Sequence, residues 1–247
     1  MKIVDITCTK KADIVLKCDA DVWADCDHLV SKVGASDFAA IETCIWINYH
    51  AAGISLEHEL RSYFKPSTCH RFDPLHVIFS NGLLGSEIML FMKQSKEQVG
   101  AYFAHFRECA ERVCWQSTGT AKPQNVFSPA REKSSRDSLK AGASELIAAY
   151  AVFKQWALET FLDKPSMQAS LRSLLALLDV ADLVLKAAAR RLQDQDVDAI
   201  ASRLDTAAFA YLEAFVNAHG RVATRHTHHA LAAQLSAQLR RDRRLPL

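Results

Sequence analysis

The stretch PSMQASLRSLLALLDVADLVLKAAARRLQDQDVDAIASRLDTAAFAYLEAFVNAHG, residues 165–220, decides the fold class of this chain. Apolar side chains recur every three or four residues on both sides of the polar sequence RLQDQD, residues 191–196, and this spacing predicts two amphipathic helices. Pro165 suits the first turn of the first helix, and Gly220 suits the end of the second. The inward-facing positions are Leu171, Leu174, Leu175, Leu178, Ala181, Leu185 and Leu192, then Val197, Ile200, Leu204, Ala208, Tyr211 and Phe215.

Two more helices flank this pair. One precedes it, with its apolar stripe at Leu139, Ala143, Leu146, Ile147, Tyr150, Phe153, Ala157 and Phe161. The other is predicted from His228 to Arg240. Because short connections between long helices favour antiparallel neighbours, we predict an antiparallel helical bundle over residues 137–247, ending in a basic tail.

The N-terminal part, residues 1–116, is predicted to be a small unit of mixed structure. Residues 2–18 alternate and are rich in Val, Ile and Thr, which predicts a β-hairpin. Short helices are expected over residues 36–46 and 56–64.

A long buried helix is predicted from Pro74 to Met92, because that stretch is apolar all round. Its small residues, Gly82 and Gly85 among them, would allow a neighbouring backbone to come close. Another helix is expected over residues 96–115. The polar stretch 117–136 then contains Pro123 and Pro129 and is predicted to be the boundary between two domains, 1–116 and 137–247. The fold class is therefore mainly α.

Composition indicates a folded intracellular protein. Apolar residues make up 49% of the chain and charged residues 23%, so a sizeable core is expected. The seven cysteines include no C-x-x-C pair, which favours a reducing compartment. No apolar run is typical of a signal peptide or a pure membrane span, so no membrane partner is expected.

The net charge is only +2, but cations gather at the C-terminus. Six arginines there are candidates for salt-sensitive contacts with nucleic-acid phosphates. They are Arg221, Arg225, Arg240, Arg241, Arg243 and Arg244.

Phosphate-binding glycine loops, nucleophile elbows and H-E-x-x-H motifs are absent from the sequence. Two clusters remain. Asp73 and His76 are three residues apart, so one helical turn would place them together, either to hold a divalent metal or with Asp73 as a helix cap. His226, His228 and His229 could complete a metal site with that pair, or could be solvated residues beside the basic tail.

Glu87 is a carboxylate within the apolar helix. A buried carboxylate without a partner is costly, so a hydrogen bond or salt bridge is expected there. A catalytic role is the alternative.

The segment RFDPLHVIFSNG, residues 71–82, followed by Glu87, resembles the Asp-x-x-His segment of eukaryotic cut-and-paste DNA transposases with a ribonuclease-H-like core. The later sequence THHAL, residues 227–231, is similar to a K-H-H motif of proteins derived from them, and a helical insertion separates the two. The resemblance implies catalytic roles for Asp73 and Glu87, a zinc site shared by the two histidine-bearing segments, DNA as partner, and a nuclear location.

The departures from that pattern are also informative. Ala233 stands where the motif usually has a further histidine, few residues precede Asp73, and no glutamate follows His229. A two-metal enzyme needs three converging carboxylates. The resemblance therefore implies a truncated or degenerate, catalytically inactive relative with a structural metal site and weak DNA binding. A helical protein–protein interaction module and a metal-dependent nuclease or transposase are the two alternatives.

Overall fold

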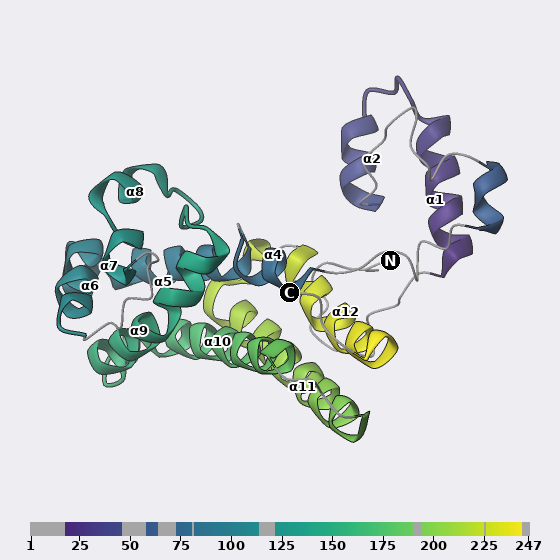
Figure 1. Cartoon of the computed structure of the whole chain (residues 1–247). Helices are drawn as coiled ribbons and strands as arrows, with labels where there is room; N and C mark the ends of the chain where they lie inside the picture. Colours follow the sequence, from purple (N-terminus) through teal and green to yellow (C-terminus); the bar gives the residue numbers. More distant parts are fainter. Residues whose placement is uncertain are drawn as a thin grey trace. The chain divides into compact units, whose positions relative to one another are not determined.

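The structure is a computed structural model of the chain (Figure 1). It describes residues 18–45, 58–63, 73–80, 82–113, 122–189, 194–224 and 226–243. Of this described part 82% is helical and none is strand, so the prediction of a mainly α fold is confirmed. The hairpin predicted over residues 2–18 lies outside the described residues, except for Cys18. The chain divides into two compact units, Met1–Arg71 and Phe72–Leu247.

The described part of the first unit is a small helical cluster. It comprises α1 (Asp19–Ser31), α2 (Phe38–Ile45) and the short 3-10 helix η3 (His58–Ser62). Arg61 on η3 donates hydrogen bonds to both carboxylate oxygens of Asp27 on α1, at 2.9 and 2.5 Å, and its guanidinium lies 5.1 Å from the ring centre of Trp23. These contacts fasten η3 to α1.

The predicted helix over residues 74–92 is two helices, α4 (Pro74–Ile78) and α5 (Leu83–Val99), so its continuity was predicted wrongly. Gly82 precedes α5, and a Cβ atom there would lie 2.2 Å from the carbonyl oxygen of Val77. No side chain fits so close to the α4 backbone, so glycine permits the tight turn.

Burial of α5 follows the prediction. All residues from Leu83 to Met89 are buried. Gly85 lets the chain before α9 approach, since a Cβ atom on it would lie 3.1 Å from the carbonyl oxygen of Leu139. The Leu139 N–H donates a hydrogen bond to the Gly85 carbonyl at 3.0 Å. The predicted close approach of a neighbouring backbone is therefore confirmed at Gly85.

Among the described residues, one helical segment, Pro74–Val99, meets the length and hydropathy criteria for crossing a membrane. Within the window that meets them, 71% is buried inside the fold. The core helix of a folded domain meets the same criteria, and α5 has that position here.

The next three helices are α6 (Tyr102–Glu111), α7 (Pro123–Val126) and α8 (Pro129–Ser134). Aromatic side chains of α6 and at the end of α7 form a core with those of α5 and α9. Because Gly100 ends α5 with a positive φ of 66°, the helix predicted from residue 96 begins later, at Tyr102. The aromatic side chains, all at most 2% exposed, are Phe91, Phe103, Phe106, Phe127, Phe153, Trp156 and Phe161.

The division between compact units does not coincide with the boundary predicted at residues 117–136. α6 packs against α9 across that boundary, and α7, which lies within the stretch, packs against α9 as well. Phe127, which ends α7, stacks on Phe153 of α9 with ring centres 5.6 Å apart and an interplanar angle of 7°. The proline-containing stretch thus contributes to the core instead of linking two cores.

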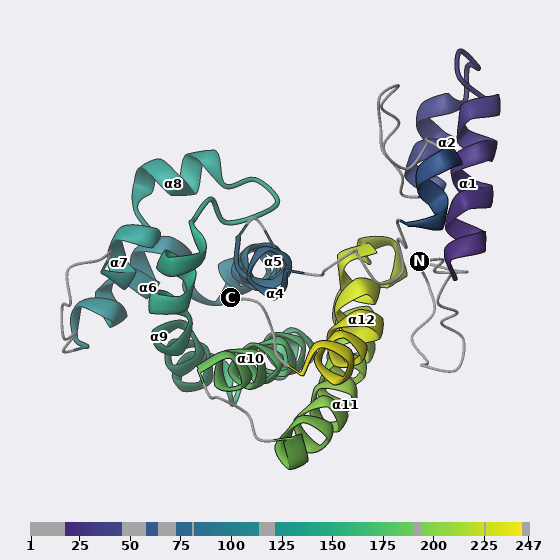
Figure 2. The ribbon, with the colours of Figure 1, turned by 45° about the vertical axis from the view of Figure 1, so that its right-hand side comes forward.

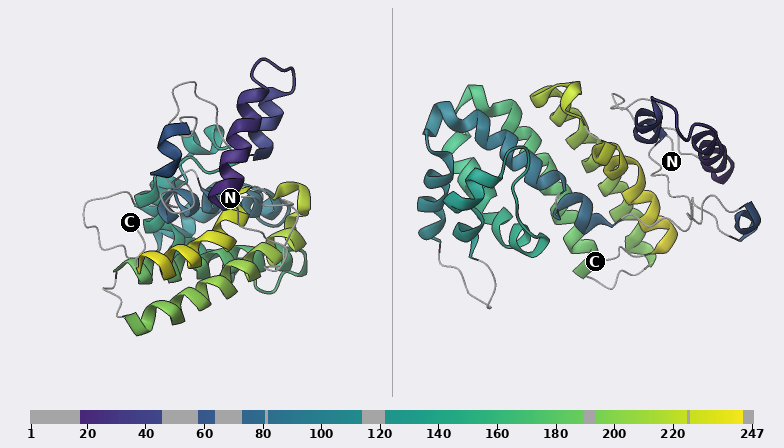
Figure 3. Two further views of the ribbon diagram at one scale, coloured as in Figure 1. Left: turned by 90° about the vertical axis from the view of Figure 1, so that its right-hand side faces the viewer. Right: turned by 90° about the horizontal axis from the view of Figure 1, so that it is seen from above.

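The predicted bundle helices are present. They are α9 (Ala143–Phe161), α10 (Gln168–Ala189, preceded by η4, Pro165–Met167), α11 (Asp194–His219) and α12 (His226–Asp242, preceded by η5, Arg221–Ala223). The most extensive packing is between α10 and α11 and between α11 and α12. These successive helices lie side by side, and each reverses the direction of the one before it (Figures 2 and 3). The bundle-like arrangement predicted for this region is confirmed.

Candidate functional site

Asp73 and His76 form one hydrogen-bonded group at the start of α4. Asp73 Oδ1 accepts the backbone N–H groups of Leu75 at 2.9 Å and His76 at 3.2 Å, while Oδ2 lies 2.5 Å from His76 Nδ1. Burial opposes ionisation of Asp73, but its hydrogen bonds from His76 and Leu75 outweigh this and lower its pKa. The helix-cap interpretation of Asp73 is confirmed, and the same carboxylate also holds the imidazole.

The helix that carries this pair packs against the helix that carries the distal histidines. Contacts join α4 to α12, within the unit Phe72–Leu247. Figure 3 shows the two elements close together in the view from above. The fold thus places in contact the two helices whose sequences were predicted to share a metal.

The two histidine side chains that the structure describes in these helices lie in different environments. His76 is 73% exposed, whereas His228 is only 2% exposed. The ring of His228 stacks on Tyr211, with centres 5.7 Å apart, and packs 4.1 Å from Phe215. The side chains of His226 and His229 are outside the described part, and no group of three metal-ligating side chains occurs within it.

Glu87 lies at the centre of a buried polar network and is fully buried. Its Oε2 accepts a hydrogen bond from the Tyr211 hydroxyl at 3.4 Å, and its Oε1 lies 3.3 Å from His219 Nε2. Burial raises the pKa of Tyr211 well above its usual value, with a further contribution from the Glu87 charge, so the phenol remains a neutral donor. The expectation that Glu87 has a partner is confirmed.

The network continues from α5 and α11 to α10. The other ring nitrogen of His219 lies 3.4 Å from Gln94 Nε2, and Ser170 donates a hydrogen bond to the Gln94 side-chain oxygen. Sequence reasoning placed Tyr211 in the core without this role and missed His219. The available signal was their spacing, since residues 211, 215 and 219 follow one another at four-residue intervals on one helix face.

Tyr211 also connects Glu87 to His228, because its hydroxyl contacts Glu87 while its ring stacks on the imidazole. Two of the residues singled out from the sequence therefore meet in one buried cluster. Such a cluster can hold helices in register and keep a carboxylate out of water.

The basic C-terminal helix uses several of its arginines within the fold. Arg240 contacts Asp205 of α11 at 3.3 Å, and Ser236 donates to the same carboxylate. Arg241 pairs with the adjacent Asp242 at 2.8 Å, and Arg243 lies 3.6 Å from Asp198. Arg221 is exposed, whereas Arg225 and Arg244 are outside the described residues.

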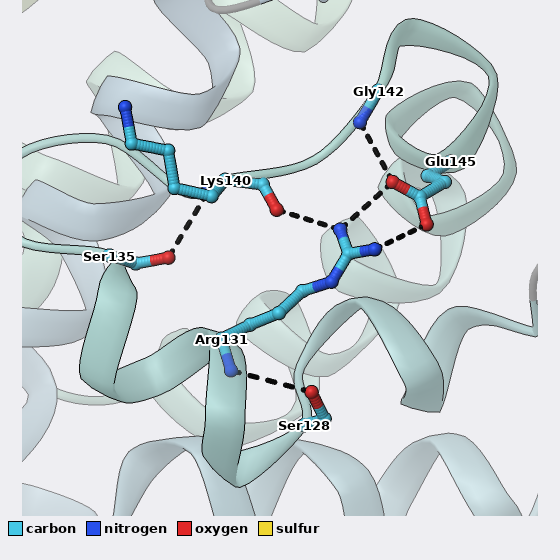
Figure 4. A network of polar contacts seen from close by, with 6 residues as sticks. All are labelled: Ser128, Arg131, Ser135, Lys140, Gly142 and Glu145. Carbon is cyan, nitrogen blue, oxygen red and sulfur yellow. Dashed lines mark hydrogen bonds and ion pairs between the residues drawn. The ribbon is translucent and has the colours of Figure 1, made fainter.

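A second polar network joins α8 to α9 (Figure 4). Arg131 donates to the two carboxylate oxygens of Glu145 at 2.8 and 2.7 Å and to the Lys140 carbonyl at 2.7 Å. The N–H of Gly142 donates to Glu145 as well, at 2.8 Å. The hydrogen bonds from Arg131 lower the pKa of Glu145, with burial acting in the opposite direction.

With this geometry established, comparison with known proteins identifies no relative: no family model, curated protein or solved structure matches the chain.

Proposed function

We propose that this chain is a catalytically inactive, transposase-derived helical protein that holds a divalent metal at the junction of α4 and α12 and binds DNA weakly. One observation supports the proposal most directly. The α4 helix, with Asp73 and His76, packs against α12, although residues 79–225 separate them along the chain. A nuclear location belongs to the same proposal.

The chemistry of the Asp73–His76 pair fits a metal. A histidine that ligates zinc commonly gives its other ring N–H to a carboxylate, which fixes the tautomer and the ring orientation. Here His76 Nδ1 contacts Asp73 Oδ2, and the imidazole is 73% exposed, so its Nε2 remains for a metal. Further ligands would come from His226 or His229 on α12. Zinc there would tie the two helices together without any catalytic step.

The positions of the two candidate catalytic carboxylates favour an inactive protein. Asp73 caps α4, whereas Glu87 has no exposed surface and is occupied by Tyr211 and His219. A carboxylate that binds a catalytic metal must lie where the same metal can contact the phosphodiester. Glu87 would have to leave its buried partners to do so.

We expect purified protein loaded with zinc to retain about one metal ion per chain. His76→Ala should lose that ion and the thermal stabilisation that comes with it, because a ligand that binds only the folded state at about 100 times its Kd stabilises by about 2.7 kcal/mol. Metal analysis after dialysis and thermal unfolding with and without chelator measure both effects.

His58→Ala is the matched control. His58 is 74% exposed and also lies near an aspartate, at 3.7 Å from Asp27, but it is in the first unit. The His58→Ala protein should keep the bound metal, and chelator should still lower its unfolding temperature. Wild-type protein that retains no zinc, and unfolds at the same temperature with chelator, would contradict the metal site. That result would favour the helical protein–protein interaction module instead.

A further inference from the structure

We infer that the nucleic-acid contact surface of this protein lies on residues 128–142, the α8 segment, instead of on the C-terminal tail. This inference rests on the DNA binding proposed above and names the residues that would contact the DNA. The α8 segment comprises α8 and the chain that leads from it to α9.

The α8 segment presents three cations to solvent, Lys133, Arg136 and Lys140. None of them takes part in an ion pair with a described residue. The nearby acids are mostly neutralised, because Asp137 pairs with Lys93 at 3.4 Å and Glu145 pairs with Arg131. Among the described residues of the α8 segment itself, Glu132, which is half-buried, is the one acid without an ion pair.

Three arginines of the tail differ in this respect. Arg240, Arg241 and Arg243 face Asp205, Asp242 and Asp198 respectively, so their charges are already compensated within the fold. A phosphate would have to compete with a carboxylate for each of them. At Asp205 that competition would also loosen the contact between α11 and α12.

Hydrogen bonds hold the backbone of the α8 segment in one conformation. Ser128 caps α8 by accepting the Arg131 N–H at 3.4 Å, and Ser135 Oγ accepts the Lys140 N–H at 3.0 Å. Arg131 also binds the Lys140 carbonyl. In Figure 4 the Lys140 side chain extends away from the Arg131–Glu145 pair. The three cations therefore extend from a hydrogen-bonded backbone, and these hydrogen bonds do not involve their charged groups.

This arrangement suits a phosphate backbone. Cations on a fixed surface give sequence-independent contacts, and the release of counterions makes such binding depend steeply on salt. Duplex DNA presents a dense row of negatively charged phosphates. The α8 segment therefore fits DNA phosphates in a way that is blind to base sequence.

The experiment measures binding of the full-length chain to a labelled mixed-sequence DNA duplex across a range of salt concentrations. Three variants each remove three positive charges: K133A/R136A/K140A in the α8 segment, R240A/R241A/R243A in the tail, and K96A/R172A/K186A at other exposed positions. Thermal unfolding verifies that each variant is folded.

Each phosphate contact contributes about 0.9 to the slope of log K against log salt, so loss of three contacts should make the slope shallower by about 2.7 in the α8 variant. The other two variants should keep the wild-type slope. A loss confined to the tail variant, or an equal loss in all three, would overturn the assignment. Equal affinity for polyglutamate of matched charge would overturn DNA as the partner. Wild-type protein that binds no DNA would remove the proposed DNA binding itself, whereas binding that the α8 variant leaves unchanged removes only this surface.

Discussion

Glu87 lies within an apolar run of α5, and its environment accounts for its presence there. The carboxylate is fully buried, with Tyr211 and His219 as hydrogen-bonding partners from α11. A carboxyl group in this position is tolerated because polar partners face it. Its need for a partner could be predicted from the sequence. The partners could not, since they are 124 and 132 residues away along the chain.

We expect Glu87→Ala to lower the free energy of unfolding by about 3–5 kcal/mol, because it leaves a cavity and two polar side chains without their partner. Glu87→Gln should cost less, since the amide keeps the volume and one acceptor oxygen. Urea unfolding followed by circular dichroism measures both. Glu97→Ala, at an exposed position of the same helix, should change stability by less than about 0.5 kcal/mol. A Glu87→Ala protein as stable as that control would show that the network does not stabilise the fold.

The histidines also show that the surroundings of a single residue could not be predicted from the sequence. His76 and His228 were both predicted as metal ligands from spacing and resemblance. One is exposed beside Asp73, and the other is buried against Tyr211 and Phe215. Spacing along a chain reveals which residues share a helix turn, but it does not reveal which of them face the core.

Among the elements, α8 shows how a polar, proline-containing stretch can be structured. The sequence of residues 117–136 predicted a boundary, because the stretch is polar and contains two prolines. In the structure, Pro123 and Pro129 begin short helices, and Arg131 joins the second of these to α9 through Glu145. A single bidentate ion pair is invisible to periodicity, so this element could not be predicted.

The Arg131–Glu145 pair should make stability depend on acid pH. Glu145 has a pKa below its ordinary value of 4.5 in the folded state, so its contribution is complete above pH 4.5 and is lost as the pH falls from there through the lowered pKa. We expect Glu145→Gln to cost about 1 kcal/mol at pH 7 and progressively less below pH 4.5. Urea midpoints of variant and wild type, measured from pH 7 to pH 3, test this.

Glu97→Gln provides the matched comparison, because Glu97 is exposed and has no ion-pair partner among the described residues. Its difference from wild type should stay near zero at every pH. If the gap between Glu145→Gln and wild type were the same at pH 3 as at pH 7, the ion pair would not be its source.

At the scale of the whole molecule, the chain forms two compact units that divide after Arg71. The larger unit includes the aromatic core, the Glu87 network and the α4–α12 contact. Its core draws on both sides of residues 117–136, since Phe106 and Phe127 both pack on Phe153. A cut within that stretch would therefore divide one core.

We expect a fragment of residues 72–247 to fold on its own and to unfold cooperatively near the temperature at which this unit unfolds in the full chain. A fragment of residues 137–247 should not, because it lacks Phe91, Phe103, Phe106 and Phe127 and would expose the aromatic face of α9. Calorimetry and near-ultraviolet circular dichroism compare the two. Cooperative unfolding of the shorter fragment would instead support the boundary predicted from the sequence.

Local periodicity in the sequence determined that α9, α10, α11 and α12 are helices, approximately where they begin and end, and that α5 is buried, because each of these depends on residues only three or four positions apart. Only the tertiary structure decided that α4 meets α12, that Glu87 faces Tyr211 and His219, and that the tail arginines pair with acids of α11 and α12. Those contacts join residues that become neighbours only when whole helices pack, and packing depends on side-chain shape over the entire core, which no short stretch of sequence contains.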